Sequence, residues 1–508
     1  MLAQFVAQYH EELLTTLQAS AISFLIYYFV LYPIYFHPLA RIPGPKLCAL
    51  TKYWILYISW SEQRNRYVHR LHEEYGPIVR VGPDEVDISD AEYMKDIYVD
   101  NFDKTSFYTQ FADFGSFNTF STVDKKSHRQ SRKVSAKLYS KSTVVSEPFQ
   151  VKVRSVMSDL LKVLDENQEK TLNTFYLWSI MAMDTISGFA FGSKVSKRLL
   201  RDPFGEGAST VVAFMTQSSA WFWTTQLPQF RRWVIPAYIN EASNVACQWI
   251  SEQFADSLDK NDETSSSLVG VLLGEPGAKV FDSNRAKSEI FDHIAAGHNT
   301  TGTTLSFYFY ELARDTKKQD RLREELKQLN GGNLATNDYS SSLYSDIEEL
   351  PYLSALTQEV FRIYAAIPGQ EPRKAPKNGF WWRGSKETPR TFIPEGKTVV
   401  MQPWSLHRDP VLFEDPELFN PDRWLIDDEQ KLKAMNKQMM HFGYGARMCL
   451  GLHIATCEIK LCVANVISRY RVSLDDSYDY ANNVQMKDIY TTIPKSRDVP
   501  LIFSGLEK

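Results

Sequence analysis

The feature that most constrains this chain is a glycine-rich segment near its C-terminus, residues 442–451, which reads Phe-Gly-Tyr-Gly-Ala-Arg-Met-Cys-Leu-Gly and matches the pattern FxxGxRxCxG. Its glycines let the backbone approach a flat macrocycle closely and turn amide groups towards the sulfur of Cys449. Arg447 stands two residues before that cysteine and can pair with an anionic carboxylate of a cofactor. The segment therefore predicts a loop that presents one thiol to a flat, anionic ligand.

The residues after Cys449 predict a helix, because Leu452, Ala455 and Ile459 recur at helical spacing. Cys449 would then lie at the start of that helix, where the helix dipole lowers the pKa of a thiol and favours the thiolate. The alternative is a buried structural cysteine, which is the usual fate of a free thiol. We assign that alternative to the cysteines without such surroundings, Cys247, Cys457 and Cys462.

Composition excludes several other classes of protein. The chain has 508 residues, of which 44% are hydrophobic and 23% charged, and this balance is typical of a globular chain with a large core. Five cysteines without a CxxC pair form neither a disulfide framework nor a zinc ribbon. The formal charge of -4 disfavours a protein that holds nucleic acid by bulk charge, so no nucleic-acid partner is expected.

The N-terminus has the pattern of a membrane anchor. No charged residue lies between Glu12 and Arg41, and residues 13–36 are long and apolar enough to span a bilayer as one helix. A cleaved signal peptide would have a basic start and small residues at its end, and this stretch has neither. A buried core helix is the third alternative, and the aromatic residues near the ends of the stretch argue against it. Basic residues follow the span, so the remainder of the chain is expected in the cytosol.

Three proline residues follow the span directly, at positions 38, 43 and 45. Proline fixes φ and biases the preceding residue towards extended backbone, which predicts a stiff spacer rather than a helix start. We therefore divide the chain into an anchor (residues 1–37), a proline-rich hinge (38–50) and one catalytic domain (51–508). Helical patterns dominate that domain, and short extended runs occur near residues 78–88 and 398–402, which predicts a mainly α fold with small β-sheets (α+β).

With these features together, the chain resembles a eukaryotic microsomal cytochrome P450, a haem-thiolate monooxygenase. The resemblance covers nearly the whole chain, because further family signatures occur in the family's order. Glu359-Val-Phe-Arg362 matches the ExxR motif, and Asn420-Pro-Asp-Arg423-Trp supplies the arginine that the family adds to that pair. The resemblance implies that Glu359, Arg362 and Arg423 form a buried structural triad which braces the cysteine loop, with Cys449 as the axial ligand of the haem iron. Taken alone, the ExxR pair would be an ordinary surface ion pair.

The segment Ala296-Gly-His-Asn-Thr-Thr301 resembles the family's oxygen-activation motif, on a helix expected from about residue 284 to 316. Gly297 followed by Thr300 implies a local opening of that helix, at which a hydroxyl turns inward. The resemblance makes Thr300 the residue that hydrogen-bonds dioxygen or its water. Asn299 stands where the family usually has Asp or Glu, and an amide orients water but carries no proton. This departure leaves the proton route open.

Other residues are implied to hold the cofactor. His128 and Arg132 share a helical face where the family places a basic pair for the haem propionates, and Arg373 stands where a strand passes the haem edge. A solvated basic face is the alternative for the first pair. The same resemblance assigns contacts with the cofactor to Phe442, Arg447, Gly451, Ala296 and Gly297.

Aromatic and small residues are expected to line the substrate pocket. The aromatic residues at spacing three between positions 105 and 123 are implied to roof it, although a core-facing helix would have the same pattern. The expected lining residues are Phe111, Phe114, Phe117, Phe291, Ala295, Ala366 and Ile367. Such a wall suits a lipophilic, mid-sized organic molecule, and these segments hold no Lys or Arg to anchor a substrate carboxylate.

The resemblance implies a function in full. The cofactor would be haem b, with O2 and with electrons from NADPH through a separate NADPH–cytochrome P450 reductase, cytochrome b5 being a second possible donor. A basic face that includes Lys126, Arg129 and Lys133 would dock that donor. The protein would be anchored in the endoplasmic reticulum membrane and would carry out a tailoring step of fungal secondary metabolism, on a terpenoid, polyketide or alkaloid. The alternatives are a housekeeping lipid or xenobiotic hydroxylase, a haem-thiolate rearrangement or dehydration enzyme that uses no O2, and a haem-binding sensor.

Overall fold

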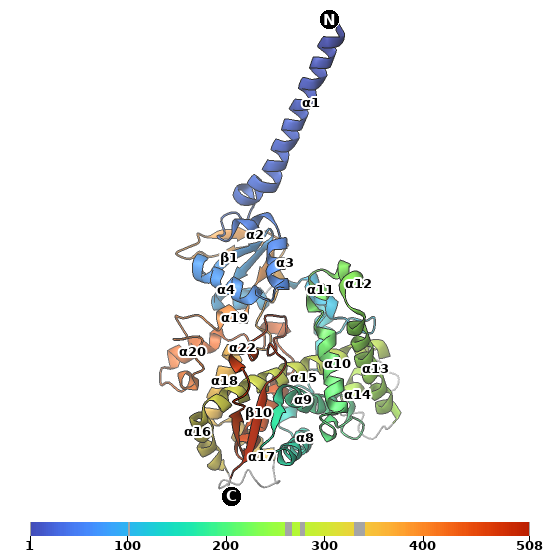
Figure 1. Cartoon of the computed structure of the whole chain (residues 1–508), viewed down its shortest axis with the longest axis vertical. Helices are drawn as coiled ribbons and strands as arrows, with labels where there is room; N and C mark the ends of the chain where they lie inside the picture. The colour runs from blue at the N-terminus through green and yellow to red at the C-terminus, as the bar shows by residue number, and fades with distance from the viewer. Residues whose placement is uncertain (1, 100–101, 260–266, 275–279, 330–340, 507–508) are drawn as a thin grey trace.

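A computed structural model of the chain describes residues 2–99, 102–259, 267–274, 280–329 and 341–506, without the side chains of residues 2–8 and 341–343. Helices account for most of the described residues, and the strands form small sheets at the periphery (Figure 1). The prediction of a mainly α fold with small β-sheets and one N-terminal apolar helix is therefore confirmed.

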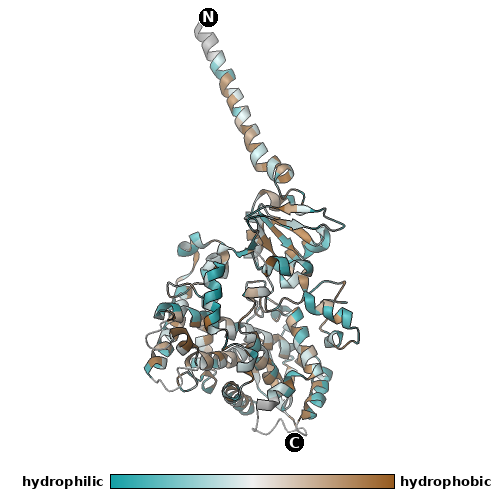
Figure 2. Cartoon of the chain, turned by 180° about the vertical axis from the view of Figure 1, so that it is seen from behind, coloured by the Kyte–Doolittle hydropathy of each residue, from teal (hydrophilic) through white to brown (hydrophobic). Residues whose placement is uncertain are grey.

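The N-terminal helix projects away from the body of the molecule (Figures 1 and 2). It consists of α1 (Leu2–Ile26) followed by a wider π-helical segment (Tyr27–Phe36) that contains Pro33. The stretch Tyr9–Phe36 is long and apolar enough to cross a membrane, and none of its most apolar window is buried against the protein. An apolar helix that no protein surface covers is consistent with an anchor that lies in lipid.

The segment after the anchor is held against the body by Arg80. This buried guanidinium donates hydrogen bonds to the carbonyl oxygens of Pro33 (2.7 Å) and Pro83 (2.8 Å), and it lies 3.1 Å from Nδ1 of His37. The irregular segment is shorter than the sequence predicted, because residues Lys46–Leu50 form α2 directly after Pro45. Proline disrupts the interior of a helix, but it is well tolerated at or just before the first residue of one. Pro45 therefore does not prevent a helix from beginning at Lys46.

The sheet nearest the anchor has five strands in the order β1-β2-β8-β5-β3. Its strands are β1 (Ile78–Gly82), β2 (Glu85–Ile88), β8 (Thr398–Val400), β5 (Arg373–Lys374) and β3 (Asp103–Lys104). The β2–β8 pair is parallel and the other pairs are antiparallel. Because β5 and β3 pair directly, with Arg373 opposite Lys104, the sheet brings two basic residues from distant parts of the sequence together.

Two smaller sheets complete the β-structure. One has the order β4-β10-β9, made by β4 (Thr171–Asn173), β10 (Pro500–Gly505) and β9 (Tyr470–Leu474). The other is the hairpin of β6 (Phe380–Trp382) and β7 (Thr391–Ile393). The first sheet joins the C-terminal strand to the helical body through its pairing with β4.

The remaining helices surround the longest one, α15. In the first half of the chain they are α3 (Tyr53–Trp60), α4 (Arg64–Tyr75), α5 (Met94–Tyr98), α6 (Lys125–Ser135), α7 (Lys141–Val144), α8 (Glu147–Glu166), α9 (Thr174–Phe191), α10 (Glu206–Ser218), α11 (Trp221–Thr225), α12 (Arg231–Val234) and α13 (Ala237–Asp259). In the second half they are α14 (Leu268–Leu273), α15 (Ser283–Arg314), α16 (Thr316–Lys327), α17 (Ser341–Glu348), α18 (Pro351–Ile363), α19 (Pro403–Leu406), α20 (Glu429–Gln438), α21 (Leu452–Ile467) and α22 (Tyr480–Asn483).

The core of the molecule forms where α9 packs along α15. Two glycines of α15 allow the close approach. A Cβ on Gly302 would lie 2.8 Å from the Cα of Ser179, and one on Gly297 would lie 3.1 Å from Ile186. Trp178 of α9 stacks on Phe309 of α15 with 4.6 Å between the ring centroids. This packing fixes the position of α15, whose opposite face lines the site described next.

Candidate functional site

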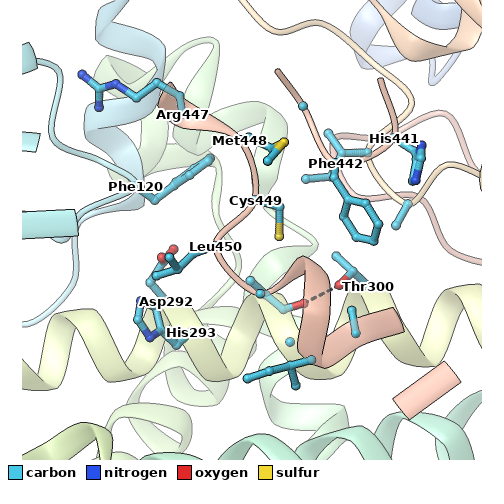
Figure 3. Close-up of a pocket in the computed structure, with 18 of the residues that line it drawn as sticks. Phe120, Asp292, His293, Thr300, His441, Phe442, Arg447, Met448, Cys449 and Leu450 are labelled. Atoms are coloured by element: carbon cyan, nitrogen blue, oxygen red, sulfur yellow. Dashed lines mark hydrogen bonds between the residues drawn. The ribbon is translucent and has the colours of Figure 1, made fainter. Parts of the chain in front are cut away.

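The principal cavity lies between α15 and the loop that carries Cys449 (Figure 3). Phe442, Gly443, Arg447, Met448, Cys449, Leu450 and Gly451 all line it. The backbone amide of Cys449 donates to the carbonyl of Phe442 at 2.8 Å and closes the loop, and α21 begins immediately afterwards with Gly451 at its N-cap. The thiol of Cys449 extends into the cavity (Figure 3).

Glycine is required in this loop for two different reasons. Gly443 and Gly445 both have φ of 71°, a region that side chains disfavour, and a Cβ on Gly445 would lie 2.4 Å from the carbonyl oxygen of Tyr98. A Cβ on Gly451 would meet no atom within 4 Å, because that position faces the open cavity. The loop therefore leaves a bare backbone surface beside the thiol, which a flat ligand can cover.

The pKa of the Cys449 thiol differs from the prediction. Burial raises it, while a backbone hydrogen bond from Gly451 and the charge of Arg132 oppose this effect without overcoming it. The helix N-terminus lies next to Cys449 as expected, but without a ligand its effect on the pKa of the thiol is smaller than the effect of burial. A positive ion in the cavity is what would favour the thiolate, since a coordinating thiol is deprotonated by its metal.

Across the cavity, α15 presents Ala296, Gly297 and Thr300. The helix is α-helical throughout, without the local opening expected at Gly297, and the Thr300 hydroxyl donates to the carbonyl of Ala296 at 2.8 Å. The bond to its own turn holds that hydroxyl at the cavity wall, as the dashed line in Figure 3 marks. Gly297 serves the contact with α9, since its missing Cβ leaves room for Ile186.

Asn299 is buried and does not belong to the cavity lining. Its Oδ1 has no hydrogen-bond partner among the residues that the structure describes. The side chain therefore lies outside the cavity although its neighbour Thr300 lines it, and an amide cannot carry a proton.

A cluster of basic side chains lines one side of the cavity: Lys104, His128, Arg132, Arg373 and Arg447. Arg447 donates to the carbonyls of Thr122 (2.5 Å) and Val123 (2.7 Å). Burial and the charge of Arg373 lower the pKa of Arg447 to about 10, and burial followed by the charge of Arg447 lowers the pKa of His128 to about 3. The cationic members Lys104, Arg132, Arg373 and Arg447 are buried or partly buried and repel one another, and an anionic ligand would relieve that repulsion.

The residues present fit a haem group. A thiol faces a bare glycine backbone, and the basic cluster beside it suits a pair of carboxylates such as the haem propionates. The sequence analysis does not predict Lys104 as a site residue, because Lys104 belongs to no recognisable motif. Only its pairing opposite Arg373 in the β3–β5 ladder brings it to the site.

The Glu359–Arg362 pair is fully buried beneath the cysteine loop. Arg362 also donates to the carbonyls of His407 (3.0 Å) and Pro416 (2.6 Å). Arg423 donates to Glu359 at 3.0 Å, and the indole N–H of Trp424 donates to the same carboxylate at 2.9 Å. The structure thus brings the three residues of the expected triad together and adds Trp424 as a fourth member.

His407 links this network to the cysteine loop. Its Nδ1 lies 3.0 Å from the carbonyl of Arg362, and its Nε2 accepts from the backbone amide of Met440 at 2.8 Å. An acceptor at Nε2 requires the proton at Nδ1, and burial, which lowers the pKa of His407, keeps the ring neutral. Met440 is two residues before Phe442, so one imidazole connects α18 to the start of the loop.

The structure changes the expected pocket wall. Ala366 and Ile367 line the cavity, and so do Tyr108 and Phe120 from the aromatic segment. Phe111 does not line it, because residues Ser106–Phe111 form a 3-10 helix whose rings pack against one another and against Tyr490. Phe117 is 55% exposed, since the chain turns away at Phe114 and Gly115, both of which have positive φ.

Phe291 and Ala295 also lie off the cavity. The α15 residues that line the cavity recur at spacing four in two adjacent rows: Asp292, Ala296, Thr300 and Thr304, with His293, Gly297 and Thr301. A neighbour one position earlier is rotated by about 100° around the helix. Phe291 accordingly stacks on Phe214 of α10, and Phe114 packs at the edge of Phe291 with 6.3 Å between centroids. These residues support the wall from behind.

A cysteine loop facing a long helix across a basic-edged cavity defines a haem-thiolate protein of mainly helical fold. Comparison with known families agrees: the family model described as "Cytochrome P450" matches residues 42–498. The chain belongs to the cytochrome P450 family, and its activity class is that of a monooxygenase. Family membership implies haem iron, dioxygen and electrons from a redox partner.

Several similar proteins are fungal. The chain is 27% identical over 476 residues to cytochrome P450 monooxygenase BOT1 of Botryotinia fuckeliana, covering 89% of this chain and 88% of that protein. It is 27% identical over 464 residues to tryprostatin B 6-hydroxylase of Neosartorya fischeri, covering 89% and 79%. It is 29% identical over 460 residues to cytochrome P450 monooxygenase stcB of Emericella nidulans, covering 85% and 81%.

Proposed function

We propose that this monooxygenase inserts one oxygen atom from O2 into a lipophilic organic molecule as a tailoring step of fungal secondary metabolism. The observation that carries the proposal is the cavity itself, which has the Cys449 thiol on one side and the Thr300 hydroxyl on the other. The fungal relatives support the pathway class, and one of them is named for the hydroxylation of tryprostatin B.

The cofactor we propose is haem b, which when bound supplies the redox chemistry of oxygen activation. Cys449 would hold it as axial ligand, and the basic cluster would bind its two carboxylates. The surrounding loop would orient the thiol, because its backbone is fixed by the Cys449–Phe442 hydrogen bond and by the start of α21. The residues Phe442, Gly451 and Ala296 would complete the contact surface.

Thr300 would position the proton that the reaction needs. Its hydroxyl is anchored on the Ala296 carbonyl, so its oxygen remains free to accept a hydrogen bond at the cavity wall. Asn299 offers no carboxyl for proton delivery and lies outside the lining. We therefore expect the proton to come through ordered water at Thr300 rather than from the neighbouring side chain.

Electrons would come from NADPH through an NADPH–cytochrome P450 reductase. Cytochrome b5 is the alternative electron donor. Exposed basic residues on α6 and α20 form the surface we assign to docking: Lys126, Arg129, Lys133, Lys431, Lys433 and Lys437. We further propose that Tyr9–Phe36 anchors the chain in the endoplasmic reticulum membrane with the catalytic domain in the cytosol. The anchor would then keep the site close to a lipophilic substrate dissolved in the membrane.

Reconstitution of the haem-loaded full chain with reductase tests this function. We expect NADPH consumption and an oxygenated product, both dependent on substrate and on reductase. A haem sensor would consume no NADPH in the presence of substrate, and a rearrangement enzyme would form product without NADPH. A panel of terpenoids, polyketides and alkaloids against fatty acids and drug-like molecules separates a tailoring enzyme from a housekeeping lipid or xenobiotic hydroxylase.

A further inference from the structure

The part of the cavity wall that α15 supplies contains an acidic residue that the proposed reaction does not use. On α15, Asp292 lies on the same face as Ala296 and Thr300, one and two turns before them, and it lines the cavity with them. Figure 3 shows the side chains of Asp292 and Cys449 extending into the same space. A carboxyl withdrawn from water is costly unless it binds a partner.

Asp292 has no such partner among the residues that the structure describes. Across the described residues, its carboxyl takes part in no hydrogen bond and no ion pair. Of the other cavity-lining carboxylates, Glu371 lies 3.6 Å from Arg373, and Glu458 stands on α21 on the cysteine side. Asp292 is therefore the acidic group on the α15 wall that is available to a ligand.

Lys104, which also lines the cavity, is bound to other groups. The ammonium group of Lys104 donates to the carbonyl of Phe120 at 2.6 Å and lies 4.0 Å from the ring centroid of Tyr108 and 4.1 Å from that of Phe120. These contacts hold it on the side of the basic cluster. The charge of Lys104 influences Asp292, but no salt bridge joins the two.

The charges behind Asp292 also favour a cation. Glu289, one turn earlier on α15, is buried and accepts from the Thr119 hydroxyl at 2.8 Å, and Asp113 is a second carboxyl in the same region. Burial, followed by the charges of Glu289 and Asp113, raises the pKa of Asp292 well above its ordinary value, so a lone carboxylate is unfavourable there and a bound cation would stabilise it. Beside it, His293 is held neutral by burial and is hydrogen-bonded to Tyr139 at 2.8 Å, so it supplies no positive charge.

We infer that Asp292 determines substrate class by binding a basic nitrogen of the substrate, so that this enzyme acts on lipophilic amines. The inference rests on the proposed function, because it names the substrate class of the same cavity. A charge-assisted hydrogen bond in a water-poor pocket gives both affinity and orientation. The neighbouring carboxylates would strengthen it, because a bound cation relieves their mutual repulsion.

The position of Asp292 also limits where oxygen can be inserted. Its Cα lies roughly 6 Å before Ala296 and roughly 12 Å before Thr300 along the helix axis, from the rise of about 1.5 Å per residue. A substrate held by its nitrogen at Asp292 would therefore present a carbon one to two helical turns away to the reactive centre. Oxidation is expected at that distance from the nitrogen and not on the carbon next to it.

A matched pair of probes tests the inference on the haem-loaded full chain. The probes are N,N-dimethyl-4-phenylbutylamine and its hydrocarbon isostere, (5-methylhexyl)benzene, which differ in the charged nitrogen alone. Dissociation constants come from the change in the haem absorption spectrum on titration. We expect the wild type to bind the amine about 10- to 100-fold more tightly, as a charge-assisted hydrogen bond provides.

The Asp292→Asn variant should lose most of that preference, and Asp292→Glu should keep it. Asp113→Asn is the matched control, since it removes a partly buried carboxyl of the same region that does not line the cavity, and it should keep most of the preference. Equal binding of the two probes by the wild type overturns the inference, and this result needs no variant to fold. An unchanged preference in Asp292→Asn overturns it as well.

Failure of the inference can be told apart from failure of the proposed function. The thiolate-type spectrum of the reduced carbon monoxide complex is recorded on each protein before titration. If the wild type lacks it, the proposed haem-thiolate function fails. If the wild type has that spectrum and shows no preference for the amine, the function stands and Asp292 does not select amines.

Discussion

The guanidinium of Arg362 meets the carboxylate of Glu359 through two hydrogen bonds of 2.8 and 2.9 Å, and both side chains are completely shielded from solvent. The same carboxylate accepts from Arg423, Trp424 and the backbone of Asn420. Such a saturated buried anion is stable only while every partner remains, because an unpaired charge in the interior is costly. The network thus holds α18 and the segment around Arg423 in one position.

Removing one partner should therefore be severe. We expect Glu359→Gln to destabilise the protein by about 3–5 kcal/mol, because Arg362 is left as a buried charge without its anion. Thermal unfolding and haem content measure this effect. Glu324→Gln is the control, since Glu324 pairs with Lys327 on the surface, and it should change stability by less than about 1 kcal/mol. Similar losses in both variants would refute a special role for the buried network.

A second prediction concerns the link through His407. We expect His407→Ala to leave the Met440 amide and the Arg362 carbonyl without partners, at a cost of about 1–3 kcal/mol for each buried group. The cysteine loop should loosen first, since Met440 lies at its start. Haem dissociation measured by transfer to an acceptor protein should become faster. If the variant unfolds earlier but releases haem at the wild-type rate, His407 stabilises the fold without bracing the loop.

The comparison of sequence and structure separates local from non-local information. The cysteine loop, the start of α21 and the Glu359–Arg362 pair could be predicted because each lies within a few residues of continuous chain. The anchor could be predicted from its uninterrupted apolar length. Lys104 could not, because its place at the cavity depends on the pairing of β3 with β5, which joins segments far apart in sequence.

The pocket wall illustrates a finer limit. Helical periodicity predicts α15 and the motif places Ala296, Gly297 and Thr300 at the cavity, but periodicity could not exclude Phe291 and Ala295 from the lining or add Asp292 to it. A rotation of about 100° decides between them. The pKa of Cys449 shows the same limit, since its direction depends on how much solvent the folded cavity excludes.

Thr300 gives a third prediction. We expect Thr300→Ala to lower the amount of product formed per NADPH consumed by roughly tenfold, which corresponds to about 1.4 kcal/mol for the loss of one hydrogen bond near the reacting group. Thr300→Ser should restore most of the coupling, because it keeps a hydroxyl at the same Cβ. Product and NADPH are measured together under substrate saturation. Unchanged coupling in the alanine variant would move the proton-handling role to another residue.

The basic surface gives a fourth prediction. Reversing Lys126, Arg129 and Lys133 of α6 to glutamate should raise the apparent KM for the reductase by about tenfold at low salt, because docking of an acidic partner would be repelled. The effect should shrink as salt rises and screens exposed charges. The three residues are exposed, so folding should be unaffected. An unchanged KM at low salt would show that the donor docks elsewhere.

The most direct test of the account is the spectrum of the reduced carbon monoxide complex of Cys449→Ala, compared with Cys247→Ala. Cys247 is a partly buried cysteine outside the cavity, so its removal leaves the proposed ligand in place. We expect the thiolate-type spectrum in the wild type and in Cys247→Ala, and its loss in Cys449→Ala. Retention of that spectrum without the Cys449 thiol would contradict the assignment on which the function depends.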